Sequence, residues 1–198
     1  MKLYIVRHGQ TDLNVKQVLA GHLPAVLTDV GLSQADLLGQ RFKAEQIDAI
    51  YSSDLLRSRQ TTEAILKYVQ CEVVYDERLR ERTWGAFDSC SVSEYRKLLD
   101  ESPIEYRYFK TEGGECIEDL ILRSKHFLDE LKEIRGEGTF LISAHHTLNK
   151  ALLFNLGAFS WEDWPNFHQE NTCVNEVSLN ADGTWNVVKI NCTTHLNT

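Results

Sequence analysis

The sequence predicts an α/β fold: a three-layer α/β/α sandwich with a mostly parallel central sheet. Short apolar runs alternate along the chain with longer segments whose apolar residues recur at helical spacing. That alternation is typical of strands joined by helical crossovers, which give a parallel sheet covered by helices on both faces. Near the C-terminus, two runs of alternating apolar residues flank Asp182-Gly183, which predicts a closing antiparallel hairpin.

Four short runs are predicted to be strands, and the hairpin adds two more. The runs are apolar or β-branched and are bounded by polar or turn-forming residues, as buried strands of a parallel sheet are. They cover residues 3–6, 49–52, 72–75 and 140–144, and the hairpin strands cover 174–179 and 185–190.

Four segments are predicted to be the helices that cover the sheet. They are 29–43, 57–69, 116–134 and 147–156. Thr28 is expected to cap the first, because its hydroxyl can accept a hydrogen bond from a free N–H of the first turn. Leu32 is expected to belong to the inward face of that helix, and Tyr68 to the inward face of the second.

The chain of 198 residues is expected to form a single domain over 1–198, since domains commonly run to about 250 residues. Residues 79–115 are less periodic than the rest and contain Gly85 and Pro103. They are predicted to form an inserted, partly helical excursion from the α/β framework.

Composition restricts the partners and the location of the protein. The content of 42 % hydrophobic and 25 % charged residues is that of an ordinary soluble globular protein. The net charge of −8 argues against nucleic acid, and no apolar run approaches the ~20 residues that span a bilayer. Five cysteines without a CxxC pair and an early-charged N-terminus predict reduced thiols and a cytoplasmic location. The sequence does not predict the oligomeric state, and a dimer is one of the open alternatives.

Basic side chains follow three of the four predicted parallel strands. Arg7 and His8 come after the first strand, Arg57 shortly after the second, and His145 after the fourth. Ligands of open α/β sheets bind beyond the carboxyl ends of the strands, so these side chains are expected to meet at one rim. Two guanidinium groups there indicate an anionic substrate group such as phosphate.

Residues 3–14 read LYIVRHGQTDLN, in which Arg-His-Gly-x-Thr-x-x-Asn follows a predicted strand. This segment closely resembles the signature of the histidine phosphatase superfamily, in its phosphoglycerate-mutase-like branch. The resemblance extends over nearly the whole chain, through segments 27–35, 52–61, 79–85, 113–116, 144–145 and 191–196. It implies the fold of that family, in agreement with the α/β architecture predicted from the pattern.

The resemblance implies that His8 attacks phosphorus and becomes phosphorylated, without a metal or other cofactor. Neighbouring cations favour the neutral ring that such an attack requires. Glu81 would protonate the leaving oxygen and then deprotonate the water that cleaves the phosphohistidine. The residues that would surround the phosphoryl oxygens are Arg7, Asn14, Arg57 and His145.

His145, Glu81 and the neighbouring His146 each carry a further expectation or an alternative. His145 is expected to be protonated against the phosphate. Glu81 stands between Arg80 and Arg82, so a surface ion-pair run is the alternative to an acid role, with Glu115 as the next candidate acid. His146 is predicted to bind substrate, with a structural place in the loop as the alternative. The histidines expected at the surface or in the core are His22, His126, His168 and His195.

The predicted function is hydrolysis of a small phosphorylated metabolite by a metal-independent histidine acid-type phosphatase. A cofactor-dependent phosphoglycerate mutase and a catalytically weak regulatory module on the same fold stay as alternatives. Cys90 and Arg96 have the C-x5-R spacing of cysteine phosphatases, but the residues between them include no glycine and one acidic residue. The sequence has no HExxH or comparable ligand set of a metallohydrolase. Residues 18–20 and His146 depart from the family pattern, so the natural substrate is not predicted.

Overall fold

The computed structural model describes residues 1–197 and contains a mixed six-stranded sheet. Its strands are β1 (Lys2–Arg7), β2 (Ala49–Ser52), β3 (Glu72–Tyr75), β4 (Thr139–Ala144), β5 (Val174–Leu179) and β6 (Trp185–Cys192). They lie in the order β3-β2-β4-β1-β5-β6, in which β3, β2, β4 and β1 are parallel neighbours. The antiparallel β5 and β6 form the predicted hairpin. The predicted, mostly parallel sheet is therefore confirmed.

The helices also follow the predicted pattern. They are α1 (Asp12–Val15), α2 (Asp29–Phe42), α3 (Leu56–Ile65), α4 (Val92–Asp100), α5 (Ile117–Arg135) and α6 (His146–Asn155). Four short 3₁₀ turns are η1 (Glu77–Leu79), η2 (Gly85–Phe87), η3 (Trp161–Asn166) and η4 (Thr194–Leu196). Thr28 caps α2 as expected, because its Oγ1 accepts the backbone N–H of Gly31 at 3.1 Å.

Two side-chain expectations for these helices are wrong. Leu32 is 47 % exposed, because the buried face of α2 is set by Gly31 and Gly39, where backbones approach too closely for a side chain. Tyr68 lies beyond the end of α3 and is only half-buried, and its hydroxyl donates to Asp36 at 3.0 Å. Gly31 packs against the backbone of Gln10, and Gly39 packs against α3 at Ala64.

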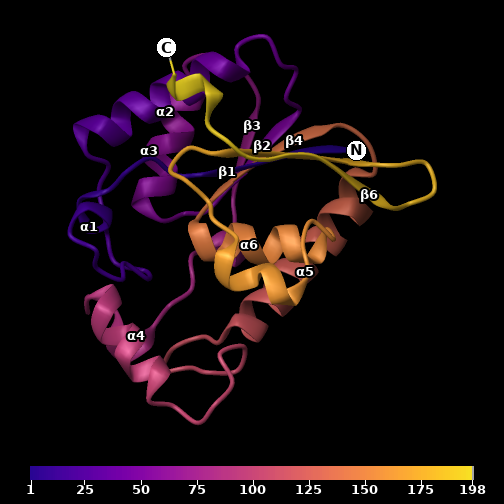
Figure 1. Ribbon diagram of the computed structural model, residues 1–198. Coiled ribbons are helices and arrows are strands. Elements are labelled where there is room, and N and C mark those ends of the chain that lie inside the picture. Colours follow the sequence, from indigo (N-terminus) through magenta and orange to yellow (C-terminus); the bar gives the residue numbers. More distant parts are fainter. Residues whose placement is uncertain (198) are drawn as a thin grey trace.

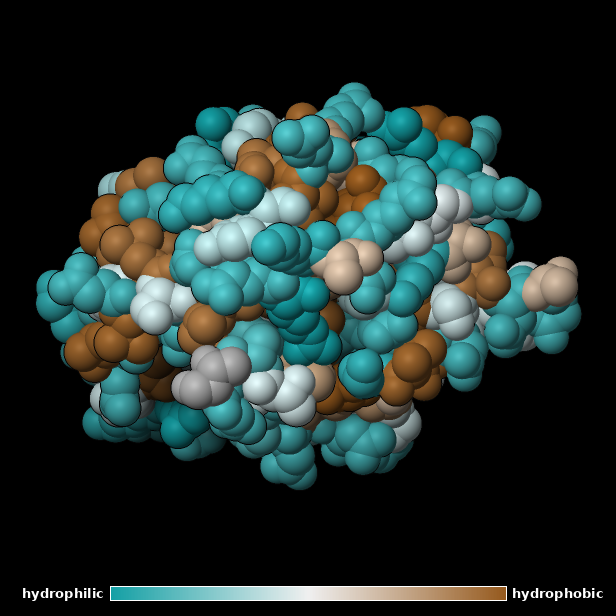
Figure 2. Space-filling view, turned by 90° about the horizontal axis from the view of Figure 1, so that it is seen from above, coloured by the Kyte–Doolittle hydropathy of each residue, from teal (hydrophilic) through white to brown (hydrophobic). Residues whose placement is uncertain are grey.

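The sheet lies between α2 and α3 on one face and α5 and α6 on the other (Figure 1). In β1, Leu3 and Ile5 pack toward α5 and α6, whereas Tyr4 and Val6 pack toward α2 and α3. Both faces of the strand are thus buried, which explains its uninterrupted apolar run. Figure 2 shows the face seen from above, where hydrophobic residues form separate patches among hydrophilic ones. No helix within residues 1–197 is long and apolar enough to cross a membrane.

The predicted excursion carries α4, which stands apart from the two helical layers at the end of the sheet where α1 lies (Figure 1). It joins the loop after α1 through backbone hydrogen bonds, from Leu19 N to Cys90 O and from Ser89 N to Leu19 O, both at 2.9 Å. Leu19 also packs with Tyr95 and Phe109 in a small separate core. Two segments distant in sequence therefore form one cover beside the carboxyl ends of the parallel strands.

Candidate active site

The structure brings the predicted histidines and arginines together at one rim of the sheet. Arg7 ends β1 and His8 follows it, Arg57 lies in the first turn of α3, and His145 connects β4 to α6. The ring centroids of His8 and His145 are 5.2 Å apart, and Arg57 Nε lies 3.2 Å from His145 Nδ1. The convergence expected from strand order is therefore present.

His8 is held as a neutral ring with one nitrogen free. It is 3 % exposed, and its Nδ1 lies 2.7 Å from the carbonyl oxygen of Gly9. A carbonyl only accepts hydrogen bonds, so Nδ1 carries the proton and Nε2 keeps its lone pair. Burial, followed by the charges of Arg57 and Arg7, lowers the pKa of His8 well below its ordinary value. The ring therefore has an unprotonated Nε2 at neutral pH.

His145 is a neutral ring in the arrangement that the structure describes, and its expected protonation beside a bound phosphate stays a prediction. Its Nδ1 accepts from Arg57 Nε, which can only donate, so the ring proton is on Nε2, 2.8 Å from Ser53 Oγ. Burial lowers the pKa of His145 well below its ordinary value, and the positive charge of Arg57 lowers it further. In this arrangement His145 is a neutral hydrogen-bond donor.

The two arginines are oriented by backbone carbonyl groups. Arg57 is 1 % exposed and donates to the carbonyl oxygens of Gly21 at 2.8 Å and Leu23 at 3.2 Å. Arg7 Nη1 donates to Gln169 O at 2.7 Å. The buried Nε of Arg7 has no hydrogen-bond partner within the described residues. A buried donor left unpaired costs ~1–3 kcal/mol, so this atom indicates a site for an acceptor such as a phosphoryl oxygen.

Glu81 follows η1 in the chain, and its side chain packs against the N-terminal end of α6. It is 6 % exposed. Its Oε2 accepts the N–H of Thr147 at 3.0 Å, and its Oε1 accepts those of Leu148 at 3.2 Å and Arg82 at 2.8 Å. His22 Nε2 lies 2.8 Å from the carbonyl oxygen of Glu81. The carboxyl group is therefore fixed in the interior beside the segment that follows His145.

The alternative of a surface ion-pair run around Glu81 is wrong. Arg80 pairs instead with Asp54, and Arg82 is 2 % exposed and donates to the carbonyl oxygens of Glu115 and Phe109. The next candidate acid, Glu115, is paired with Arg123 at 3.0 Å. Neither flanking arginine therefore neutralises Glu81 by an ion pair.

Asn14 belongs to α1 and lies close to the backbone of His8. Its Oδ1 accepts the N–H of Thr11 at 3.1 Å in a capping box. Asn171 donates to the carbonyl oxygen of His8 at 3.0 Å and lies 3.4 Å from Asn14 Oδ1. Sequence reasoning missed Asn171, which lies in an irregular segment before β5, where no periodicity marks it.

His146 begins α6 next to His145. Burial, then the charges of Arg7 and Lys150, lowers its pKa to about 3. Together with Thr147 and Lys150 it lines a cavity of about 520 Å³ between α6 and the excursion that carries α4. His146 therefore lies in the wall of this cavity, and its role in substrate binding stays a prediction. Sequence reasoning also missed Lys150, since a lysine within a helix is usually exposed.

Comparison with known proteins identifies a family for nearly the whole chain and relatives for about two thirds of it. The sequence model described as histidine phosphatase superfamily (branch 1) matches residues 3–193. The broad-specificity phosphatase YOR283W of Saccharomyces cerevisiae is 36 % identical over 145 residues, which are 70 % of this chain and 61 % of the yeast protein. The mouse fructose-2,6-bisphosphatase TIGAR is 36 % identical over 132 residues, 64 % of this chain and 49 % of that protein.

The fold is also similar to that of solved structures. A mycobacterial glucosyl-3-phosphoglycerate phosphatase, solved with VO₃, superposes with a TM-score of 0.84 at 25 % identity. The superposition covers 96 % of this chain and 99 % of the mycobacterial one. This chain spans about half to three fifths of the length of the two curated relatives, but nearly all of the mycobacterial chain.

Proposed function

This chain belongs to branch 1 of the histidine phosphatase superfamily, and from that premise we propose that it hydrolyses a small phosphorylated metabolite through a phosphohistidine on His8. The named phosphatases among its relatives support its assignment as a phosphoric monoester hydrolase. The observation that carries the mechanism is the hydrogen bond from His8 Nδ1 to Gly9 O, which leaves Nε2 free to attack.

In the first step, Nε2 of His8 forms a bond to phosphorus while the bond from phosphorus to the substrate's alcohol oxygen breaks. That oxygen takes a proton from Glu81, because an alkoxide is a poor leaving group. Arg7, Arg57, Asn14 and His145 hold the phosphoryl oxygens, and His145 does so by turning its Nε2–H from Ser53 Oγ to the phosphate. A donor placed in this way is typically worth ~3–4 kcal/mol in the transition state.

In the second step, water attacks the phosphorus and the bond to Nε2 breaks. The carboxylate of Glu81 takes a proton from the water, so that inorganic phosphate leaves and Glu81 returns to its acid form. Glu81 thus serves both steps from one position, which its three backbone hydrogen bonds support. His146 shapes the choice of substrate through its place in the cavity wall.

The same proposal includes a single domain over 1–198 and a cytoplasmic location. The family match over residues 3–193 supports the first, and five free cysteines support a reducing compartment.

Covalent labelling of His8 tests this proposal. Brief incubation with a ³²P-labelled phosphomonoester and an alkaline quench should leave acid-labile label on the wild-type protein. His8→Ala should abolish the label and lower kcat by about a hundredfold or more. His126→Ala, which changes an exposed histidine of α5, should keep both. Acid-stable label, or a fully active His8→Ala enzyme, would contradict the mechanism.

A further inference from the structure

The cavity beside Glu81 has a composition that differs from the phosphate site. Its volume is about 520 Å³, and aromatic side chains of the excursion, Trp84, Tyr95 and Tyr106, form much of one wall. Thr147, on the opposite wall, donates its backbone N–H to Glu81. An acid that protonates the leaving oxygen must touch it, so the alcohol part of a substrate would extend from Glu81 into this space.

Lys150 places a buried positive charge in that cavity. It is 5 % exposed, and its Nζ donates to the carbonyl oxygen of Trp164 and lies 5.1 Å from the centre of the Trp164 ring. Within residues 1–197, no carboxylate oxygen lies within 4.0 Å of this ammonium group. Burial lowers the pKa of Lys150 to about 8, and the charge of Glu81 opposes this fall.

Tyr95 gives the cavity lining a polar atom without a hydrogen-bond partner. Its ring packs against Trp84 and Phe109, with ring centroids 6.3 Å and 5.9 Å away. Its hydroxyl oxygen is buried and makes no hydrogen bond to any residue that the structure describes. A buried hydroxyl is normally paired, so this atom also indicates that the cavity receives a polar group.

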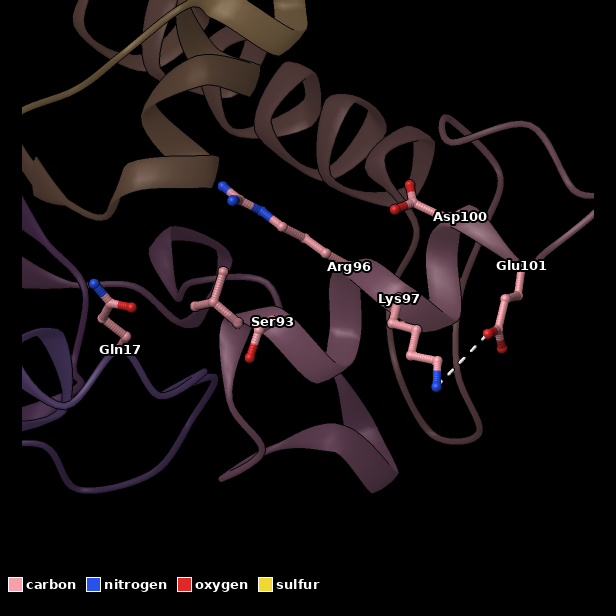
Figure 3. A pocket seen from close by; sticks show the side chains of 7 residues that line it. Gln17, Ser93, Arg96, Lys97, Asp100 and Glu101 are labelled. Atoms are coloured by element: carbon pink, nitrogen blue, oxygen red, sulfur yellow. Dashed lines mark ion pairs between the residues drawn. The ribbon is translucent and has the colours of Figure 1, made fainter.

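Arg96 adds an exposed cation at the edge of the cavity. It is exposed on α4 and lines both this cavity and the neighbouring groove formed with Gln17. Figure 3 shows that groove, where Lys97 pairs with Glu101 while Arg96 extends in the opposite direction. The positive charge of Arg96 is therefore directed away from Asp100 and Glu101 (Figure 3).

We propose that this cavity binds the alcohol part of the substrate and that Lys150 selects molecules with a second anionic group on an apolar or aromatic skeleton. The anion would pair with the ammonium group, and the aromatic wall would cover the skeleton. A carboxylate and a second phosphate share this chemistry. The inference rests on the proposed function, since it assigns the leaving-group side of the same site.

The test compares the kcat/KM values of matched aryl phosphates. The substrates are phenyl phosphate, the 3- and 4-carboxyphenyl phosphates, their neutral carbamoyl analogues, and benzene-1,4-diyl bisphosphate. The wild-type enzyme should prefer at least one carboxylate or the bisphosphate over the neutral analogues by about tenfold or more, mainly through KM, since a hydrogen bond to a charged group is strong. The carboxylate and bisphosphate arms distinguish the two kinds of anion.

Lys150→Met keeps the length of the side chain and removes its charge, so it should lower the preference for the anionic substrates to less than about threefold. Lys97→Met removes a cation of the neighbouring groove and should retain the full preference. Tyr95→Phe removes a hydroxyl without a partner in the described protein, so it should fold and should raise KM for the anionic substrates.

A wild-type enzyme without preference for any anionic substrate would overturn the inference, as would a folded Lys150→Met variant that keeps the preference. The wild-type comparison needs no variant, so the inference can be tested even if Lys150→Met unfolds. Absence of wild-type activity on every phosphate, phenyl phosphate included, would instead count against the proposed function.

Discussion

Glu81 Oε2 accepts the backbone N–H of Thr147 at 3.0 Å, so the proposed acid is tied to the helix that starts beside His145. Glu81→Gln keeps the shape of the side chain but removes the transferable proton. We expect it to slow hydrolysis of alkyl phosphates by ~10²–10⁴-fold, the usual value of general acid help. With 4-nitrophenyl phosphate the first step needs little proton donation, so stopped-flow absorbance should show a burst of nitrophenol followed by a slow phase.

The control for this experiment is Glu115→Gln, which changes the next candidate acid. It breaks the pair with Arg123 and is expected to cost stability without separating alkyl from aryl substrates. Equal losses on both substrate types in Glu81→Gln, without a burst, would show that Glu81 is not the acid.

Gly21→Ala should damage the site through the backbone. Gly21 has φ of +44°, and a Cβ there would lie 1.9 Å from Asp88 Oδ1. The carbonyl oxygen of Gly21 also accepts a hydrogen bond from Arg57, so displacing the loop would release one side of that guanidinium. We expect kcat/KM on an aryl phosphate to fall by ~10–100-fold, in the range seen when a positioning group shifts by about 1 Å.

Gly183→Ala is the matched control for this substitution. Gly183 also has a positive φ, of +84°, but lies in the turn of the hairpin with no atom within 4 Å of its added Cβ. It should lower the melting temperature through backbone strain and leave kcat/KM unchanged. Similar activity losses in both variants would contradict the role assigned to Gly21.

Stability should fall on mild acidification because of buried neutral histidines. The folded-state pKa values of His8 and His145 lie well below the ordinary value, that of His146 is about 3 and that of His195 about 4. Below pH ~6.5 these imidazole rings bind protons in the unfolded chain but stay neutral in the folded one. The free energy of unfolding therefore falls as pH falls. Each such histidine costs up to ~1.4 kcal/mol per pH unit.

Chemical denaturation between pH 7.5 and pH 5.5 measures this effect. His146→Gln should reduce the pH dependence by up to one proton, whereas His126→Gln, at an exposed position on α5, should leave it unchanged. A free energy of unfolding that is constant or rises over this range would refute the assignment of neutral rings.

Activity should survive dialysis against a chelator. Arg7 and Arg57 supply positive charge at the phosphate site, and no group of three or more possible metal ligands occurs among residues 1–197. Vanadate should inhibit, because it can adopt the five-coordinate geometry of phosphoryl transfer, and the mycobacterial relative has been solved with VO₃. Loss of activity with chelator that one divalent ion restores would overturn this prediction.

Sequence reasoning predicted the parts of the site that depend on local pattern. His8 and His145 each follow a short buried strand, and parallel strands carry such residues to the same rim, so their meeting could be predicted. Lys150 and Asn171 could not, because their positions depend on tertiary contacts. Lys150 is buried only because η3 brings Trp164 over α6, and no periodicity in the sequence indicates that fold-back.

Backbone hydrogen bonds join Leu19 to residues 89 and 90 of the excursion, so the loop and the excursion form one cover that can vary apart from the sheet. The side chains proposed to hold the phosphate lie at the carboxyl ends of the parallel strands and in the segments that follow them, whereas the proposed cover over the leaving group is formed mainly by the excursion and a neighbouring loop. Mutations in the cover can therefore change which alcohol groups the site accepts, while the residues proposed to act on phosphorus stay the same. Exchanging residues 82–115, which leaves the proposed acid Glu81 in place, together with residues 17–20, should therefore exchange substrate preference between two such enzymes.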